Sequence, residues 1–403
     1  MQETSVPMPY AGLKVLDLSQ GFAGPYCAAL LAMQGADVVK VEPPAGDWIR
    51  EVGGGQDGVT AWTVVANAGK RSVCIDATQP EGRALLLRLA RGIDVIVQNF
   101  RPGVIERLGL GYDVLAADNP KLLFVSVTGF GERGPDAKKA GSDSVLQAYT
   151  GMAQLNRLPD GTPRRIPFLL PDTVTGIYAA QAIGAALYAR ATSGRGRHLR
   201  LSLLESCAAL QAASILDAAL SDGKPPLPST VPAGIFRTSD GFMTVTSMSD
   251  AMFASLLRVV GLGAWVEDFR YAAMEARQKN AGVINEALAA RLAGNTTEHW
   301  IGAFTKADVL CSKVLDYAAL VGAPQTVEMK VFGSVDQVPY GAIDVARVPG
   351  GSVDWLVGRA PLKGEHTDAI VRGAGLDEAE RSRLVASKII FQAPPHSNAK
   401  ATR

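Results

Sequence analysis

Short β-branched runs alternate with helical segments through the first half of the chain, and this rhythm constrains the fold more than any other feature. The runs lie at residues 15–19, 37–41, 72–75, 95–98 and 122–127. Helices are predicted between them, first at 25–34, with Pro25 near the first turn, and then from a Thr78-x-x-Glu81 capping box to about Gly92. This alternation is typical of a mostly parallel, doubly wound sheet. The sequence therefore predicts an α/β fold.

The second half of the chain changes character. Long helices are predicted at 174–191 and 204–220, the second entered through a capping box formed by Ser202 and Glu205. Proline then becomes frequent up to residue 232, which is typical of a linker. A smaller unit is predicted to follow, opening with two antiparallel strands on either side of a Ser-Asp-Gly turn.

Composition narrows the classes of function. The 403 residues include 40 Lys and Arg against 39 Asp and Glu, which argues against wholesale binding to nucleic acid or to an anionic membrane. No basic region precedes an apolar stretch at the amino terminus, so no signal peptide is expected, and residues 173–188 are too short for a membrane span. The four cysteines and four histidines are scattered without metal-ligand spacing. We therefore expect a cytoplasmic protein with reduced thiols and no metal.

Residues 98–112 are the most informative segment for function. They follow an apolar run at 94–98, so they lie where an α/β sheet presents its ligand-binding loops. Phe100, Arg101 and Arg107 stand there among glycines that let the backbone approach a ligand closely. Arginine pairs bidentately with phosphate, and phenylalanine stacks on a planar base. The segment thus favours a ligand with a base and phosphates, the alternative being solvated surface charges.

Three common nucleotide and hydrolase motifs are not supported. Glu42 lies where the ribose-binding acid of a dehydrogenase would stand, but the loop at 21–25 lacks the Gly-x-Gly-x-x-Gly pattern. Residues 69–72 match the end of a P-loop, but Val64 occupies the position of its first glycine. No Gly-x-Ser-x-Gly elbow is present. These absences disfavour a dehydrogenase, a P-loop nucleotidase and a serine hydrolase.

Asp172 precedes a long apolar helix and has two interpretations. As a helix N-cap it would contribute about 1 kcal/mol to stability, and caps are far commoner than nucleophiles. The same position also suits chemistry, because a helix N-terminus stabilises a carboxylate and Gly176 on the first turn leaves room for a substrate. A carboxylate held in this way can attack an activated acyl carbon.

The sequence resembles the class III coenzyme A transferases, the family of formyl-CoA:oxalate and carnitine CoA-transferases that also contains the α-methylacyl-CoA racemases. The matching segments are residues 12–18, 23–25, 35–43, 69–72, 80–82, 99–103, 106–112, 194–196 and 360–368. The resemblance implies that Asp172 is the catalytic aspartate and that coenzyme A binds near residues 99–107. The expected coenzyme A contacts are Asn99, Phe100, Arg101 and Arg107, with the backbone of Val41, Glu42 and Pro43 lining the pocket. For Lys70 and Arg71, phosphate contact and a plain surface role stay equally open.

The resemblance also implies the domain organisation. A large Rossmann-like domain is expected at 1–222, a linker at 223–233 and a small inserted α+β domain at 234–325. Residues 326–403 are expected to return to the large domain, so that each chain forms a ring and two rings interlock into a homodimer.

Several positions depart from the family pattern. Ser142 replaces the histidine that racemases use to move a proton, and serine is no general base near neutral pH without activation. Asp143 is interpreted as a cap of a helix starting at Ser144. Phe22 stands where formyl-CoA transferases have glutamine, and the segment at 246–250 lacks their run of glycines, which disfavours formyl and oxalate substrates. Phe22, Ser142 and Gly176 are the predicted substrate-pocket residues.

The prediction is therefore a CoA-transferase that moves coenzyme A from an acyl-CoA donor, with succinyl-CoA as a candidate, to a free carboxylic acid. Asp172 would form an anhydride and then an aspartyl-CoA thioester, with no tightly bound cofactor. An acyl-CoA racemase and a non-catalytic CoA-binding protein are the alternatives. Arg164 and Arg165 either pair with the second carboxylate of a dicarboxylate or are solvated.

Overall fold

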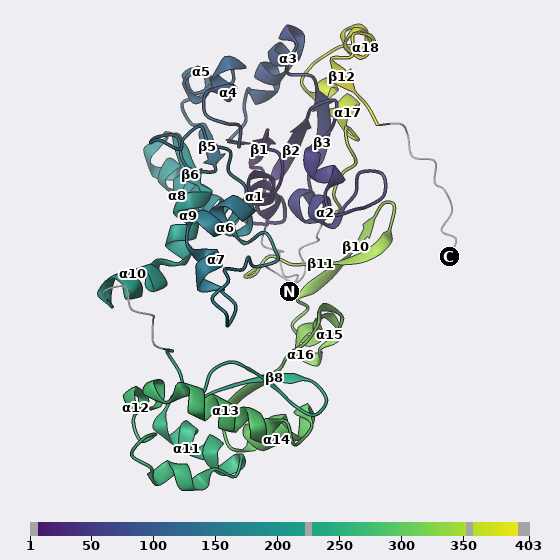
Figure 1. Cartoon of the computed structure of the whole chain (residues 1–403). Coiled ribbons are helices and arrows are strands. Elements are labelled where there is room, and N and C mark those ends of the chain that lie inside the picture. The colour runs from purple at the N-terminus through teal and green to yellow at the C-terminus, as the bar shows by residue number, and fades with distance from the viewer. Residues whose placement is uncertain (1–6, 222–227, 352–357, 394–403) are drawn as a thin grey trace. The chain divides into compact units, whose positions relative to one another are not determined.

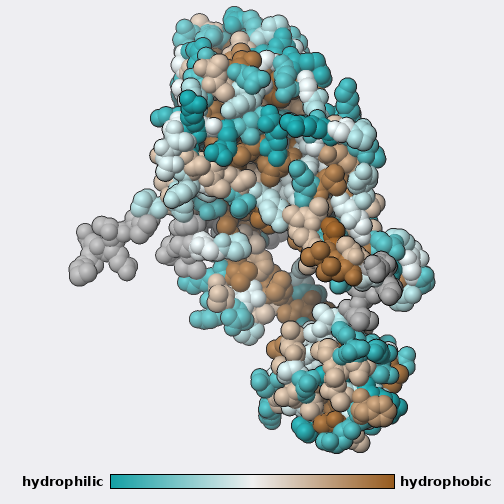
Figure 2. Space-filling model, turned by 90° about the vertical axis from the view of Figure 1, so that its left-hand side faces the viewer, coloured by the Kyte–Doolittle hydropathy of each residue, from teal (hydrophilic) through white to brown (hydrophobic). Residues whose placement is uncertain are grey.

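The computed structural model describes residues 7–221, 228–351 and 358–393 (Figure 1). The chain divides into two compact units. The larger comprises Met1–Ala212 and Lys330–Arg403, and the smaller comprises Ala213–Met329. Residues 223–227 of the predicted linker lie outside the described residues. Hydrophilic and apolar side chains are interspersed over the visible surface of each unit (Figure 2).

A seven-stranded sheet forms the centre of the larger unit. Its strands are β1 (Lys14–Asp17), β2 (Asp37–Glu42), β3 (Arg71–Ile75), β4 (Val95–Gln98), β5 (Leu123–Thr128), β6 (Arg197–Ser202) and β12 (Ile390–Phe391). Their order is β12-β3-β2-β1-β4-β5-β6, and only β12 runs antiparallel to its neighbour. The order 3-2-1-4-5-6 is that of a doubly wound sheet. The predicted α/β fold with a mostly parallel sheet is confirmed.

Helices cover both faces of this sheet, because successive strand residues point to opposite sides. Val15 packs in a core with helices α1 (Ala23–Ala32) and α8 (Leu170–Ser193). Leu16 packs on the other face with α3 (Pro80–Ala90), and from the carboxyl-terminal segment α17 (Thr367–Gly373) and α18 (Glu378–Ala386) join the same core. The carboxyl-terminal segment is thus part of the larger unit.

Shorter elements complete the larger unit. They are the 3-10 helix η1 (Trp48–Glu51), the helices α2 (Ala61–Asn67), α4 (Val104–Arg107), α5 (Tyr112–Asp118), α6 (Asp143–Tyr149), α7 (Met152–Leu155) and α9 (Leu203–Leu210), and the antiparallel pair β10 (Phe332–Gln337) and β11 (Gly341–Ala346). The capping box at the start of α9 is confirmed, because the Ser202 hydroxyl accepts from the Glu205 amide and donates to its carboxylate. The box predicted at Thr78 is wrong: its hydroxyl donates to Asp76, and α3 begins at Pro80.

The helix predicted at 204–220 is two helices, α9 and α10 (Ala212–Leu220), bent by 64°. Among the described residues no single helix is long and apolar enough to cross a membrane, although this bent pair meets the test together by length and composition.

The smaller unit has its own core. The strands β7 (Ile235–Arg237), β8 (Phe242–Thr246) and β9 (Leu310–Lys313) form an antiparallel sheet, which confirms the predicted strand pair. The helices are α11 (Asp250–Val259), η2 (Gly263–Glu267), α12 (Met274–Lys279), α13 (Ala281–Leu292), α14 (Thr297–Lys306), α15 (Tyr317–Gly322) and α16 (Pro324–Glu328). Buried residues of β7, β8, α11, α13 and α14 pack together in this core.

Candidate active site

A cavity of about 380 Å³ opens at the carboxyl end of the sheet. The loops after β1, β4 and β5 meet there, because parallel strands end at the same edge. Its wall includes Phe22 from the first loop, Phe100 and Arg101 from the second, Ser142 at the start of α6, and Asp172. Asn99 lines it too, so the sheet topology brings six of the predicted site residues together.

Asp172 lies in the first turn of α8, but it is not the N-cap. The helix begins at Leu170, its N-cap is Leu169, and no side chain caps it, so the interpretation of Asp172 as a cap is wrong. Burial raises the pKa of Asp172 to about 7, and the charge of Asp143 adds to the shift. The carboxyl group is therefore half-ionised near neutral pH.

Asp143 is the second carboxylate of the site. Helix α6 begins at Asp143 itself with Ser142 as N-cap, so the prediction of a cap for a helix starting at Ser144 is wrong. Its side chain is buried, accepts a hydrogen bond from Gln147 Nε2 at 2.7 Å and lies 3.5 Å from the amide nitrogen of Asp172. Burial raises the pKa of Asp143 as well. The site thus holds two poorly solvated carboxyl groups side by side.

A second cavity of about 320 Å³ adjoins the loops after β2 and β4. Its lining is mainly apolar and includes Val41, Pro43, Phe100 and Val104. Phe100 lines both cavities.

The other residues predicted near these cavities lie as follows. Asn99 lines the first cavity, but its side-chain amide is bonded to Gln20, donating to the carbonyl at 2.6 Å and accepting from the backbone N–H at 2.8 Å. Arg101 is exposed at the first cavity. Arg107 is exposed on α4 and lines neither cavity. Its guanidinium lies beside Gly103, where a Cβ would stand 3.3 Å from Nη1.

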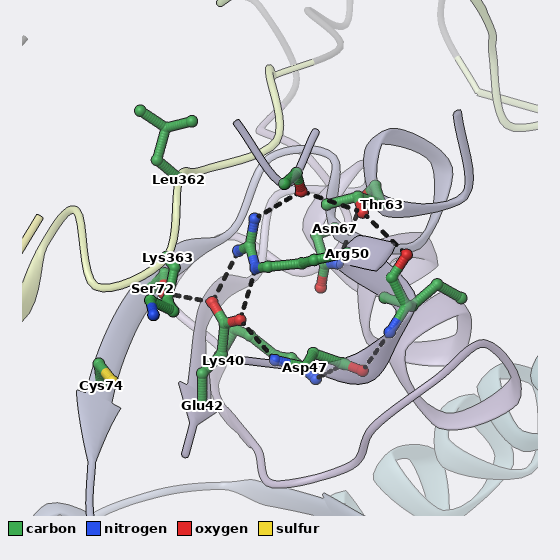
Figure 3. Close-up of polar contacts among 12 residues, drawn as sticks. Lys40, Glu42, Asp47, Arg50, Thr63, Asn67, Ser72, Cys74, Leu362 and Lys363 are labelled. Atoms are coloured by element: carbon green, nitrogen blue, oxygen red, sulfur yellow. Dashed lines mark hydrogen bonds and ion pairs between the residues drawn. The ribbon is translucent and has the colours of Figure 1, made fainter. Parts of the chain in front are cut away.

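Glu42 does not face the second cavity. It is fully buried and accepts hydrogen bonds from Arg50 at 2.6 and 2.7 Å and from the Ser72 hydroxyl at 2.7 Å (Figure 3). Burial would raise the pKa of Glu42, but Arg50 and Lys40 outweigh it and lower the pKa to about 2. The inclusion of Glu42 in the coenzyme A pocket is therefore corrected: it belongs to the interior.

The proposed contacts of Lys70 and Arg71 with phosphate are also wrong. The Lys70 ammonium is buried and donates to Asp17 at 2.7 Å, to the Pro25 carbonyl at 2.7 Å and to Asn67 at 3.1 Å, so all three of its protons are used. Arg71 begins β3, at the amino end of the sheet, and pairs with exposed Asp37 there. Lys70 therefore lies beneath the carboxyl edge without lining either cavity, and Arg71 lies at the opposite end of the strands.

Gly176 also has a different role from the predicted one. Gly176 is a buried residue of α8 at its contact with α1. A Cβ there would lie 2.9 Å from the Ala23 carbonyl oxygen and from the Tyr26 ring. Glycine therefore allows the two helices to approach closely, and Gly176 does not line the cavity. Phe22 does line it, stacked on Tyr26 with ring centroids 5.3 Å apart.

The cavity-wall residues that sequence reasoning missed include Gln20, Trp48 and Lys139. The Lys139 ammonium lies 5.1 Å from the ring centroid of Phe130 and 5.3 Å from that of Tyr149. Lys139 follows β5, so the rule that ligands bind at the carboxyl ends of strands could have pointed to it. Trp48 follows β2, in the 3-10 helix η1, so the same rule could have pointed to it as well.

Comparison with known proteins decides the family. The model of CoA-transferase family III matches residues 10–367. The chain belongs to CoA-transferase family III. It is 38% identical over 283 residues to the succinate–glutarate CoA-transferase of Agrobacterium fabrum, covering 67% of this chain and 70% of that protein. It is 32% identical to the succinyl-CoA–D-citramalate CoA-transferase of Chloroflexus aurantiacus, covering 97% and 100%.

Solved structures agree with this assignment. A CAIB/BAIF family protein from Brucella suis superimposes with a TM-score of 0.81 at 31% identity, covering 92% of this chain and all of that one. This family III CoA-transferase is therefore an enzyme that transfers coenzyme A, and coenzyme A thioesters are its substrates.

The buried Glu42–Arg50 pair gives a stability prediction. Because the pKa of Glu42 is lowered from 4.5 to about 2 on folding, its charge stabilises the fold above pH 4.5, and this stabilisation is lost as the pH falls towards 2. Glu42→Gln should lower the free energy of unfolding by about 3 kcal/mol at pH 7 and by less at pH 4. Urea unfolding at both pH values measures this. Arg71→Ala, which breaks an exposed pair, is the control and should cost about 0–1 kcal/mol. If Glu42→Gln lowers the free energy of unfolding equally at both pH values, the lowered pKa of Glu42 is contradicted.

Proposed function

We propose that this enzyme moves coenzyme A from an acyl-CoA donor to a free carboxylic acid, with Asp172 as the nucleophile. The observation that carries the proposal is the position of Asp172. It stands in the first turn of α8, on the wall of a cavity that also presents the cations Arg101 and Lys139. A carboxylate can attack a thioester carbonyl there while the cations hold the anionic end of the ligand.

The reaction would proceed through two covalent enzyme species. An oxygen of Asp172 attacks the acyl carbon, the C–S bond breaks, and coenzyme A leaves as the thiolate, which gives a mixed anhydride. The thiolate attacks Cγ of Asp172, the donor acid leaves with the bridging oxygen, and an aspartyl-CoA thioester remains. The acceptor carboxylate then attacks Cγ, and the same two steps run in reverse. One thioester replaces another, so no external energy source is needed.

The surroundings of Asp172 support this role. Its pKa of about 7 makes the ionised carboxylate more basic, and hence more nucleophilic, than an exposed aspartate. The amino end of α8 stabilises negative charge on the same group. Asp143 maintains the raised pKa through its own charge.

The ligand would lie across both cavities. The adenine would occupy the apolar cavity beside Phe100, with the backbone at Val41 and Pro43 as its other wall. Arg101 and Arg107 lie on the loop and helix after β4 and would pair with the phosphates, and Lys139 faces the same cavity as Arg101. The thioester would then reach Asp172 along the first cavity.

Succinyl-CoA is the proposed donor, and a dicarboxylic acid is the proposed acceptor. Both relatives described above carry a dicarboxylic acid in their names. Arg164 and Arg165 are exposed just before α8, and Arg165 is close enough to Asp143 to oppose the rise of its pKa. Arg165 is therefore the better placed of the two to pair with the distal carboxylate.

The proposed assembly is an interlocked homodimer. The chain leaves the larger unit after Ala212 and returns to it at Lys330, as a ring requires. Helix α10 is apolar yet has no buried residue, and Leu216 and Leu220 are 58% and 77% exposed. A second chain covering these side chains would remove that apolar surface from water.

Replacing Asp172 tests the nucleophile. Asp172→Asn keeps the shape of the side chain but removes its negative charge, so kcat with succinyl-CoA and glutarate should fall on the order of 10⁴-fold or more. Hydroxylamine added during turnover should convert Asp172 of the wild-type enzyme to a hydroxamate that mass spectrometry detects. Full turnover by Asp172→Asn, with no modified peptide in the wild type, would refute the mechanism.

The pH profile tests the coupling of the two carboxylates. Because Asp172 must be ionised to attack, kcat/KM should rise through about pH 7. Asp143→Asn removes a nearby negative charge, so the pKa of Asp172 and the midpoint of the profile should shift to lower pH. Asp37→Asn, at the amino end of the sheet, is the control and should leave the midpoint in place. An unchanged or higher midpoint in Asp143→Asn would show that the charge of Asp143 does not raise the pKa of Asp172.

Coenzyme A affinity tests the phosphate contacts. Arg101→Ala and Arg107→Ala should each weaken binding roughly ten- to hundredfold, because a charge-assisted hydrogen bond contributes about 1.5–3 kcal/mol. Calorimetry with coenzyme A measures the loss, which should disappear for a pantetheine thioester without phosphates. Arg71→Ala serves as the matched control, since Arg71 lies at the other edge of the sheet. Unchanged affinity in both variants would show that the phosphates bind elsewhere.

A further inference from the structure

The loop between β1 and α1 forms part of the cavity wall and is held at three successive residues. The Lys40 ammonium donates to the Ser19 carbonyl, and Asn99 binds both backbone groups of Gln20. The Gly21 amide donates to Asp47 Oδ1 at 2.9 Å. The loop therefore keeps its shape through contacts with side chains of other segments.

Asp47 connects this loop to the segment after β2. Besides the Gly21 amide, its Oδ1 accepts from the Ile49 amide at 3.1 Å, which caps the 3-10 helix η1. Its Oδ2 accepts from Lys40 at 2.8 Å, and its own amide donates to Glu42 at 3.1 Å (Figure 3). Asp47 is 2% exposed, so its carboxylate is held by protein donors and is shielded from solvent. One carboxylate thus sets the position of both the loop and the start of η1.

Trp48 is the first residue of η1 and the side chain that this arrangement presents to the cavity. It is 56% exposed and lines the cavity together with Phe22 and Asp172. Its indole lies so close to Gly21 that a Cβ there would overlap the ring. Asp47 therefore binds the backbone on both sides of this contact, at Gly21 and at Ile49, the residue after Trp48.

We propose that Asp47 is a positioning residue that fixes Trp48 and Phe22 as the wall against the acyl group, and so sets which acids the enzyme accepts. The inference rests on the proposed reaction at Asp172, because the acyl carbon must then lie in the cavity that these aromatic side chains line. The function of Lys40 is to hold the second oxygen of Asp47, so that the first stays directed at the Gly21 and Ile49 amides.

The variant Asp47→Asn keeps a polar side chain of nearly the same shape but removes its negative charge. It therefore tests whether the carboxylate itself positions the loop and Trp48. Its oxygen can still accept from one side, but its amide group cannot accept from the Lys40 ammonium, so the Gly21 loop and Trp48 should lose their fixed arrangement. The measurement is kcat/KM with succinyl-CoA as donor and acetate, glutarate or benzoate as acceptor. Asp47→Asn and Trp48→Ala should each change the preference between glutarate and benzoate about tenfold in favour of the bulkier acid.

A double variant tests whether Asp47 acts through Trp48. If it does, Asp47→Asn combined with Trp48→Ala should show no larger change in preference than Trp48→Ala alone. If the changes in preference of the two single variants multiply in the double variant, the two residues act independently and the inference is overturned. Trp48→Phe should restore part of the preference, because an aromatic ring again fills the wall.

The control is Leu384→Ala, a cavity-forming change in α18 that should lower Tm without touching the cavity wall. It should leave the preference among acids unchanged. If Asp47→Asn lowers kcat/KM for every acid by one common factor, its role is structural only and the inference is wrong. If Asp47→Asn is not recovered folded, an unchanged preference in Trp48→Ala overturns the inference by itself.

Asp172→Asn distinguishes the two proposals. Turnover by Asp172→Asn would refute the proposed function, whatever Asp47 does. An inactive Asp172→Asn together with an unchanged preference in Asp47→Asn and Trp48→Ala would refute only the role of Asp47.

Discussion

A buried cluster of opposite charges beneath the carboxyl edge of the sheet is the interaction on which the rest of the site depends. Three carboxylates, Asp17, Glu42 and Asp47, face three cations, Lys40, Lys70 and Arg50, and every member is buried. Burial would raise the pKa of Asp17, yet Lys40 and Lys70 hold it below its usual value. Charges removed from water are tolerated only when each is paired. These six residues form a framework that supports the loops lining the cavity. Removing any one of its charges would leave a buried charge without a partner and would destabilise the fold.

This cluster also joins segments that are distant in the sequence. Arg50 donates to the Pro361 carbonyl, and the Ser72 hydroxyl accepts from the Gly364 amide. The carboxyl-terminal segment follows the smaller unit in the sequence. These hydrogen bonds attach it to the strands whose loops line the cavity. His366 belongs to this connection, since its Nδ1 accepts from the Ser72 amide at 3.2 Å, which is a structural role.

The carboxyl groups proposed for the chemistry differ in their physical character from this framework. The framework carboxylates are each paired with a cation, whereas among the described residues no ion pair joins Asp172 or Asp143 to a cation, and burial raises the pKa of both. A group that is costly to ionise is a better nucleophile once ionised. In the proposed reaction one thioester is exchanged for another, so a reactive carboxylate and a fixed cavity would be sufficient without an energy source.

The sequence was sufficient to predict the sheet and the cluster of loops at its edge, because strand periodicity and the rule for parallel strands are local and general. Phe22, Phe100, Arg101, Ser142 and Asp172 do meet in one cavity. Glu42 and Lys70 were misassigned, because the burial of a charge depends on partners supplied by other segments of the chain. Arg71 has the surface role that the sequence left open, paired with exposed Asp37. Gly176 was misread because its neighbour is another helix. Strand β6 went unpredicted, since its sequence Arg-His-Leu-Arg-Leu-Ser is that of a polar edge strand.

The central claim is that Asp172 is the nucleophile, and the path of one oxygen atom tests it most directly. In a single turnover with enzyme in excess, succinyl-CoA would react with glutarate carrying oxygen-18 in its carboxylates. If Asp172 accepts and passes on the acyl groups, one labelled oxygen should remain on Asp172, and the released succinate should be unlabelled. Mass spectrometry of the peptide and of the acid measures both. Labelled succinate with an unlabelled Asp172 would mean that the acceptor attacks the thioester directly, and would contradict the account.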